Sequence, residues 1–110
     1  MGNRFLEIDD HAALDSLITV SKQKPVIIFK HSDACSISAR AYREMEKVEA
    51  QVNILVVQSA REVSRHLATL TGVRHETPQV IVLRDGKAVW NASHFDVQAG
   101  AVAKAVESHR

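Results

Sequence analysis

Hydrophobic residues follow two alternating patterns along this chain. Continuous apolar runs of four residues occupy positions 26–29, 54–57 and 80–83. Such a run is apolar on both faces, which is typical of a strand inside a sheet that is covered on both sides. Between the runs, apolar residues recur every three or four positions, as they do on the buried face of a helix. The pattern therefore predicts an α/β protein.

Four segments show the helical spacing. The residues predicted to face inward are Leu14, Leu17 and Ile18 in the first, Ile37, Ala41, Met45 and Val48 in the second, Val63, Leu67 and Leu70 in the third, and Val97, Ala101, Val102 and Ala105 in the last. Asp9 or Asp10 is placed to cap the first helix, and Asp96 is placed to cap the last. Ser59 and Glu62 form a capping-box pattern, which indicates that the third helix begins there.

Glycines mark two of the expected chain reversals. Gly72 is placed to end the third helix in a left-handed conformation. Asp85 and Gly86 form a strong two-residue hairpin signal, so residues 87–91 should return antiparallel to the strand before them. A further short strand is expected at residues 5–8, ahead of the first helix.

The predicted order of elements is β-α-β-α-β-α-β-β-α. Strands joined by a helical crossover are parallel and the crossover is right-handed, whereas the final hairpin adds an antiparallel edge. This arrangement resembles the thioredoxin-like fold, a central mixed β-sheet with helices on both faces. We expect one such domain over residues 1–110, because a chain of this length suits one domain and can bury a core without disulfides or metals.

Composition narrows the class of protein. The chain is 45% hydrophobic and 25% charged, with a formal net charge of +1 when histidine is neutral. This balance provides no electrostatic argument for binding nucleic acid or an anionic membrane, and the apolar runs are too short to span a membrane. Acidic residues near the start oppose a secretory signal, and a single cysteine cannot form an internal disulfide. We therefore expect a cytoplasmic protein.

That cysteine, Cys35, lies in the stretch HSDACSIS at residues 31–38. It follows a predicted strand and stands at the first turn of a predicted helix, where unpaired N–H groups and the helix dipole favour an anion. A thiolate is an anion and is the nucleophilic form of cysteine. Lys30 and His31 could assist its formation, and Asp33 would oppose it. A buried structural cysteine is the alternative, but the polar neighbours favour a nucleophile.

Two further positions bear on the chemistry of Cys35. Ser38 stands three residues after the sulfur, where a dithiol redox site has its second cysteine. Its hydroxyl either donates a hydrogen bond to the thiolate or only completes a helical turn. Pro78 directly precedes a strand, where in a thioredoxin fold a cis-proline packs against the reactive cysteine. The backbone of Thr77 would then be free to pair with an extended substrate as an added strand.

Three spaced motifs resemble those of the YtxJ-type family of thioredoxin-like proteins, the monothiol bacilliredoxins also called bacilliredoxin C. The matching residues are Lys30, His31, Ser32, Cys35, Ile37 and Ser38 in the first motif, Glu76, Pro78 and Gln79 with Thr77 in place of Ser in the second, and Trp90, Ala92, Ser93 and His94 in the third. The family often has proline where this chain has Ser36. Phe29 stands where thioredoxins place a buried carboxylate, so a dithiol proton relay is not expected.

The resemblance implies a monothiol thiol–disulfide oxidoreductase, active in the response to oxidative stress, that removes a low-molecular-weight thiol from capped client proteins. The expected thiol is bacillithiol, which acts as a cosubstrate, and no cofactor or metal is implied. The residues implied in the site are Cys35 and Ser38 for catalysis, and Thr77, Pro78, His31 and Ser36 for substrate binding. An exposed position in a loop is the commoner case for His31 and His94.

Two other hypotheses keep the same fold. In the first, Cys35 is an iron–sulfur ligand shared with a small thiol between two subunits, as in monothiol glutaredoxins, although their C-G-F-S pattern is missing here. In the second, the chain is a non-enzymatic adaptor whose groove at Thr77 and Pro78 holds partner proteins.

Overall fold

The computed structural model describes residues 5–110 and shows a five-stranded mixed sheet with helices on both faces. The elements are β1 (Phe5–Glu7), α1 (His11–Val20), β2 (Val26–His31), α2 (Ser36–Glu46), β3 (Val52–Val56), α3 (Arg61–Thr71), β4 (Gln79–Arg84), β5 (Lys87–Ser93), the 3-10 turn η1 (His94–Asp96) and α4 (Ala99–Ser108). This order confirms the one predicted from the sequence.

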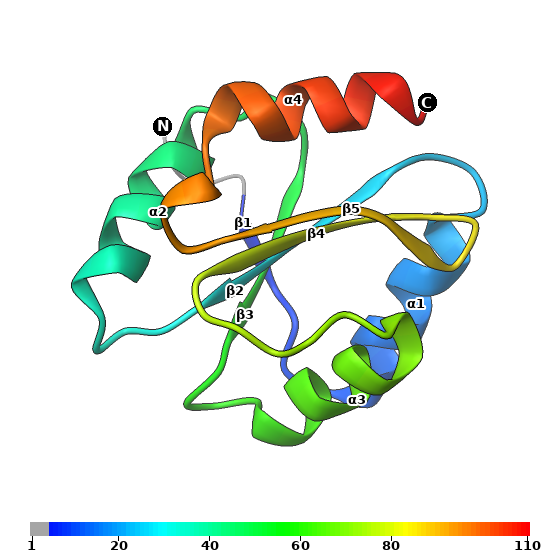
Figure 1. Cartoon of the computed structure of the whole chain (residues 1–110). Coiled ribbons are helices and arrows are strands. Elements are labelled where there is room, and N and C mark those ends of the chain that lie inside the picture. Colours follow the sequence, from blue (N-terminus) through cyan, green and yellow to red (C-terminus); the bar gives the residue numbers. More distant parts are fainter. Residues whose placement is uncertain (1–4) are drawn as a thin grey trace.

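The strand order in the sheet is β1-β3-β2-β4-β5, with β2 at the centre. β1 and β2 both run parallel to β3, whereas β4 runs antiparallel to β2 and pairs with β5 as a hairpin. As Figure 1 shows, α2 and α4 cover one face of the sheet, and α1 and α3 cover the other. The carboxyl ends of β2 and β3 therefore meet the start of β4 at one edge of the sheet.

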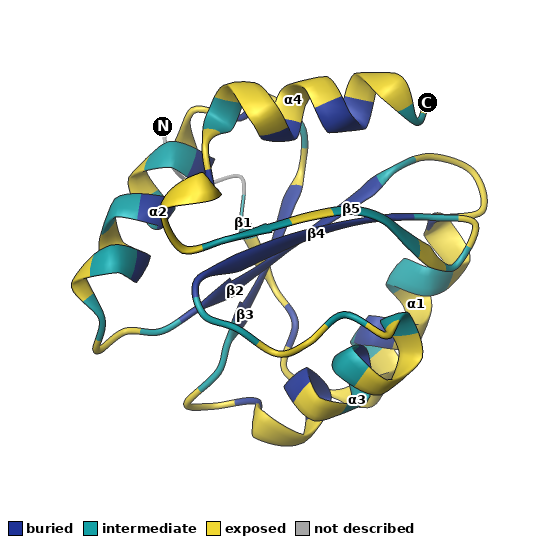
Figure 2. Cartoon of the chain, in the orientation of Figure 1, coloured by how far each residue is buried: buried dark blue, intermediate teal, exposed yellow. Residues whose placement is uncertain are grey.

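A hydrophobic core lies on each side of the sheet, because successive side chains of a strand point to opposite faces. On β2, Ile27 and Phe29 belong to the core beneath α2 and α4, whereas Val26 and Ile28 belong to the core beneath α1 and α3. Figure 2 shows the central strands buried along most of their length. The continuous apolar runs are thus explained by burial on both faces.

The turn signals in the sequence are confirmed. Asp10 caps α1, since its carboxylate accepts a hydrogen bond from the N–H of Ala13 at 2.8 Å. Gly72 ends α3 with φ of 70°, in the left-handed region. Asp85 and Gly86 form the hairpin turn with φ of 56° and 75°, respectively. Each of these signals depends only on residues close by in the chain.

Two predicted helix starts are wrong. α3 begins at Arg61 with no side-chain cap, because Ser59 instead takes part in a turn, where its N–H donates to the carbonyl of Val56 at 3.0 Å. Asp96 does not cap α4, because it lies in η1, which is closed by a hydrogen bond from the Val97 N–H to the His94 carbonyl at 3.2 Å. In both places a local turn delays the helix.

The inward faces of two helices also differ from the prediction. Leu70 is 46% exposed in the last turn of α3, whereas Ser64, near the start of this helix, is buried and forms a hydrogen bond with His75. In α4, Ala101 is exposed and Val106 is buried.

Over the described part of the chain, none of the helices combines the length and apolar character needed to cross a membrane.

Candidate functional site

Cys35 is the N-cap residue of α2, directly after the loop that leaves β2. Its backbone is extended, with φ of −124° and ψ of 127°, and its carbonyl accepts a hydrogen bond from the N–H of Ala39 at 3.1 Å. The thiol is partly exposed and makes no side-chain cap hydrogen bond. The cysteine therefore stands at a helix N-terminus, as predicted.

The loop before Cys35 is held from both sides. On one side, the buried Ser38 hydroxyl accepts a hydrogen bond from the N–H of Ser32 at 3.2 Å. On the other side, Gln58 donates to the Ser32 hydroxyl at 2.8 Å and accepts from the N–H of Asp33 at 3.3 Å. Within residues 5–110, no hydrogen bond joins Ser38 to the Cys35 sulfur. Ser38 is thus seen to anchor this loop.

Gln58 had no place among the residues predicted for the site. The only signal for it in the sequence is its position just after the apolar run of β3, at the edge where parallel strands end. Its partners lie on a different strand and loop, 25 and 26 positions away, so no local pattern marks the contact.

His31 is the last residue of β2 and is only 8% exposed, so the expectation of an exposed loop histidine is wrong. The strand continues through it because His31 pairs with Val56 of β3. Its Nε2 lies 3.2 Å from a carboxylate oxygen of Asp33, and its ring packs 5.2 Å from that of Tyr42. Burial lowers the pKa of His31 despite the nearby Asp33 carboxylate, which favours a neutral ring.

A buried hydrogen bond joins the strand that leads to Cys35 with the strand that follows Pro78. Lys30 of β2 lies opposite Gln79 of β4, and its Nζ donates to the Gln79 Oε1 at 3.1 Å. The Gln79 amide also donates to the Arg74 carbonyl at 2.9 Å. Burial lowers the pKa of Lys30 to about 8, against the opposing effect of the Glu76 carboxylate. The first and second sequence motifs therefore meet in the hydrogen bond between Lys30 and Gln79.

Lys30 should leave a pH signature on stability. Between pH 8 and 10.5, the unfolded lysine binds a proton and the folded one largely does not, so folding is favoured as the pH rises through this window. We expect the free energy of unfolding of the wild type, relative to that of Lys30→Met, to increase over this range and to level off on either side. Urea unfolding of both proteins at a series of pH values measures the difference.

Lys104→Met is the matched control, because Lys104 is exposed on α4. Its stability curve should run parallel to that of the wild type. A Lys30→Met curve that also stays parallel would contradict the low pKa of Lys30.

The Thr77–Pro78 peptide bond is cis, as expected from the thioredoxin-like fold. Pro78 is buried, and its carbonyl accepts a hydrogen bond from the N–H of His94 at 2.8 Å. Thr77 is half-buried, and no hydrogen bond to its backbone occurs among residues 5–110. The pairing of this backbone with an incoming strand stays a prediction.

The sheet brings the remaining candidates to the same edge. Ser36 is exposed at the first position of α2, beside Cys35, whereas Thr77 and Pro78 lead into β4 next to the end of β2. His94 is exposed in η1, with φ of 56°. The described residues contain no group of three or more histidine, cysteine, aspartate or glutamate side chains that could hold a metal ion.

Comparison with known proteins agrees with this geometry. The sequence model of the family described as "Monothiol bacilliredoxin BrxC" matches residues 6–102. A solved protein proposed to be an oxidoreductase with a thioredoxin fold shares 31% identity, with a TM-score of 0.82 and 92% of each chain covered.

Thioredoxins are more distant in sequence. That of Fasciola hepatica shares 15% identity with a TM-score of 0.76, over 96% of this chain and 99% of its own. A mutant thioredoxin from Halobacterium salinarum shares 21% identity with a TM-score of 0.68, over 96% of this chain and 89% of its own. These two similarities show the fold alone.

Proposed function

Because this chain belongs to the monothiol bacilliredoxin family and is a thiol–disulfide oxidoreductase, we propose that Cys35 removes a low-molecular-weight thiol, bacillithiol foremost, from capped client proteins. The observation that carries the proposal is the position of the only cysteine, partly exposed at the N-terminus of α2. A single nucleophilic sulfur can accept a cap but cannot release it by forming an internal disulfide.

The reaction consists of two exchange steps. In the first, the Cys35 thiolate attacks the cap sulfur of the mixed disulfide, the client–cap S–S bond breaks, and the client leaves as a thiolate. In the second, another small thiolate attacks the capped Cys35, which releases a disulfide of two cap molecules and restores the Cys35 thiolate. Over the cycle, the mixed disulfide of client and cap is reduced by two electrons, and the cap and the incoming small thiol end as one disulfide, which balances the cycle. Reduced thiols of this kind are maintained in a cytoplasm, where we place the reaction.

The residues beside Cys35 would hold the client. We assign to Thr77 the pairing of its free backbone with an extended client segment, next to the cis-proline Pro78. Ser36 is exposed beside the sulfur and would contact the cap or the client. His31 lies beneath this surface and would contribute mainly through the Asp33 carboxylate that it holds. Ser38 would preserve the shape of the loop around the attacking sulfur.

Intact-mass spectrometry after exposure to oxidised bacillithiol tests the proposal. We expect one adduct per chain, located on Cys35, that disappears when reduced bacillithiol is added in excess. Parallel exposure to oxidised glutathione shows which of the two small thiols Cys35 accepts more rapidly.

Failure to form an adduct with either disulfide would refute thiol transfer. Visible absorbance after anaerobic reconstitution with iron and sulfide would instead support the iron–sulfur carrier. Partner binding that persists in a variant without the thiol would support the adaptor.

A further inference from the structure

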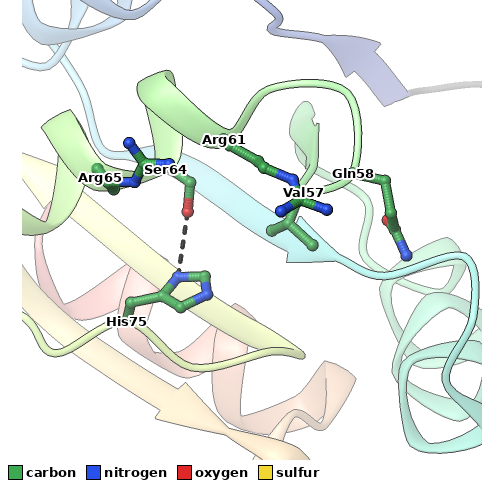
Figure 3. A pocket seen from close by; sticks show the side chains of 6 residues that line it. All are labelled: Val57, Gln58, Arg61, Ser64, Arg65 and His75. Carbon is green, nitrogen blue, oxygen red and sulfur yellow. Dashed lines mark hydrogen bonds between the residues drawn. The ribbon is translucent and has the colours of Figure 1, made fainter.

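A hollow lies beside the loop that leads to Cys35, and the exchange chemistry described above does not use it. It is a cavity of about 360 Å³ between the start of α3 and the loop that leads to β4 (Figure 3). Its lining consists of Val57, Gln58, Arg61, Ser64, Arg65 and His75. Five of these six side chains are polar, and none is a carboxylate.

The charge in this hollow is positive. Arg61 and Arg65 are four residues apart on α3, which places them on the same face of the helix. Figure 3 shows both among the side chains that line the hollow, with Arg61 extending toward Val57 and Arg65 beyond Ser64. Among residues 5–110, neither guanidinium forms an ion pair or a side-chain hydrogen bond. Arg61 is also the first residue of α3, where the positive end of the helix dipole adds to its charge. The hollow is therefore suited to an anion, and guanidinium groups match the two oxygens of a carboxylate.

Ser64 and His75 make one part of the lining polar and neutral. The Ser64 hydroxyl lies 3.1 Å from Nδ1 of His75, and the dashed line in Figure 3 marks this contact between α3 and the loop. Burial and the nearby Lys30 charge lower the pKa of His75, while Glu76 opposes them. A neutral imidazole leaves the second ring nitrogen able to donate to or accept from a bound ligand.

The rim of the hollow is joined directly to the loop before Cys35. Gln58, which lines the hollow, makes the two hydrogen bonds to Ser32 and Asp33 described above. Val57, another lining residue, donates its N–H to the carbonyl of His31 at 2.9 Å. A small molecule whose sulfur reached Cys35 could thus extend across this loop and place an acidic group in the hollow.

We infer that this hollow, hereafter the arginine pocket, binds the carboxylate groups of the low-molecular-weight thiol while its sulfur is exchanged at Cys35. The inference rests on the proposed function and makes it more specific: the substrate is a cap that carries at least one carboxylate. Arg61 and Arg65 would hold the carboxylate, and the pair formed by Ser64 and His75 would hydrogen-bond to the polar part of the cap.

Transfer of two model caps to Cys35 tests the inference. A neutral peptide with one cysteine is capped either with mercaptosuccinate, which has two carboxylates, or with 2-mercaptoethanol, which has none. We expect Arg61→Gln/Arg65→Gln to transfer the mercaptosuccinate cap about tenfold more slowly than the wild type, because charged hydrogen bonds are lost at a partly solvated site. Transfer of the 2-mercaptoethanol cap should change by less than about twofold, since no charged contact is lost.

Lys87→Gln/Lys104→Gln is the control, because it removes two positive charges from exposed positions outside the pocket. It should behave like the wild type with both caps. An equal loss with both caps in the arginine variant, or no loss with either, would overturn the inference. A third substrate, an acidic peptide capped with 2-mercaptoethanol, tests the client instead of the cap. If the arginine variant loses transfer only with this substrate, the inference is overturned in favour of an acidic client.

Binding without exchange separates the pocket from the proposed function. S-methylated mercaptosuccinate cannot exchange, and it should shift the NMR signals of Arg61, Arg65 and His75 in the wild type. In the arginine variant it should leave the His75 signal unchanged. No shift in the wild type overturns the pocket. Shifts without any transfer to Cys35 support the pocket and refute the exchange reaction.

Discussion

We expect the Cys35→Ser variant to lose transfer of the thiol cap by about a thousandfold or more. A serine hydroxyl is not ionised near neutral pH, and no second thiol in the chain could replace it. Because Cys35 is partly exposed and makes no cap hydrogen bond, the change should leave the fold intact. The rate of release of a client thiol from a bacillithiol-capped protein measures the loss.

Ser36→Ala is the matched control, since Ser36 is the next residue and its exposed hydroxyl takes no part in the hydrogen bonds that hold the loop before Cys35. Its transfer rate should stay within a few-fold of the wild type, because only a rim contact is altered. Transfer that persists in Cys35→Ser at the rate of the wild type would show that another group carries the reaction.

The largest expected effect on stability comes from Phe29→Ala. Phe29 is fully buried on the central strand, and its ring contacts those of Phe5 and Tyr42 at centroid distances of 6.2 and 6.3 Å. Truncating a buried phenylalanine typically costs about 3–5 kcal/mol, since both buried area and packing are lost. Stability of a domain is usually about 5–15 kcal/mol, so the variant should lose a large part of its free energy of unfolding. Urea unfolding followed by circular dichroism measures the change.

Phe95→Ala provides the comparison, because Phe95 is 59% exposed in η1 and contacts mainly the guanidinium of Arg40. Phe95→Ala should lower the free energy of unfolding by only about 0.5 kcal/mol, as most surface substitutions do. Equal costs for the two phenylalanines would contradict the assignment of Phe29 to the core.

The element order could be predicted because it depends on local patterns. Apolar runs on both faces indicate central strands whatever their partners are, and turn residues such as Gly72 and Asp85 act through their own backbone angles. The predicted helix starts at Ser59 and Asp96 were wrong, because at both places a backbone hydrogen bond closes a turn before the helix begins. The family resemblance, based on three motifs, is confirmed by the match over residues 6–102.

The candidate site was predicted only in part. Cys35 at the helix start and the cis bond before Pro78 were both expected and are present. The roles of the side chains around them are still predictions. The buried position of His31 was missed, because the apolar run stops at Phe29 while the strand continues through Lys30 and His31.

The sequence by itself determined that this is a one-thiol protein of the thioredoxin-like α/β type, with its sulfur at a strand–helix junction. Only the tertiary structure decided that Lys30 pairs with Gln79, that Gln58 holds the loop before Cys35, and that two arginines of α3 line a hollow beside that loop. The physical reason is separation along the chain. Lys30 and Gln79 are 49 positions apart, and Gln58 and Ser32 are 26 apart. Periodicity reports which face of an element is buried, whereas contacts over such separations depend on how the sheet is ordered and registered.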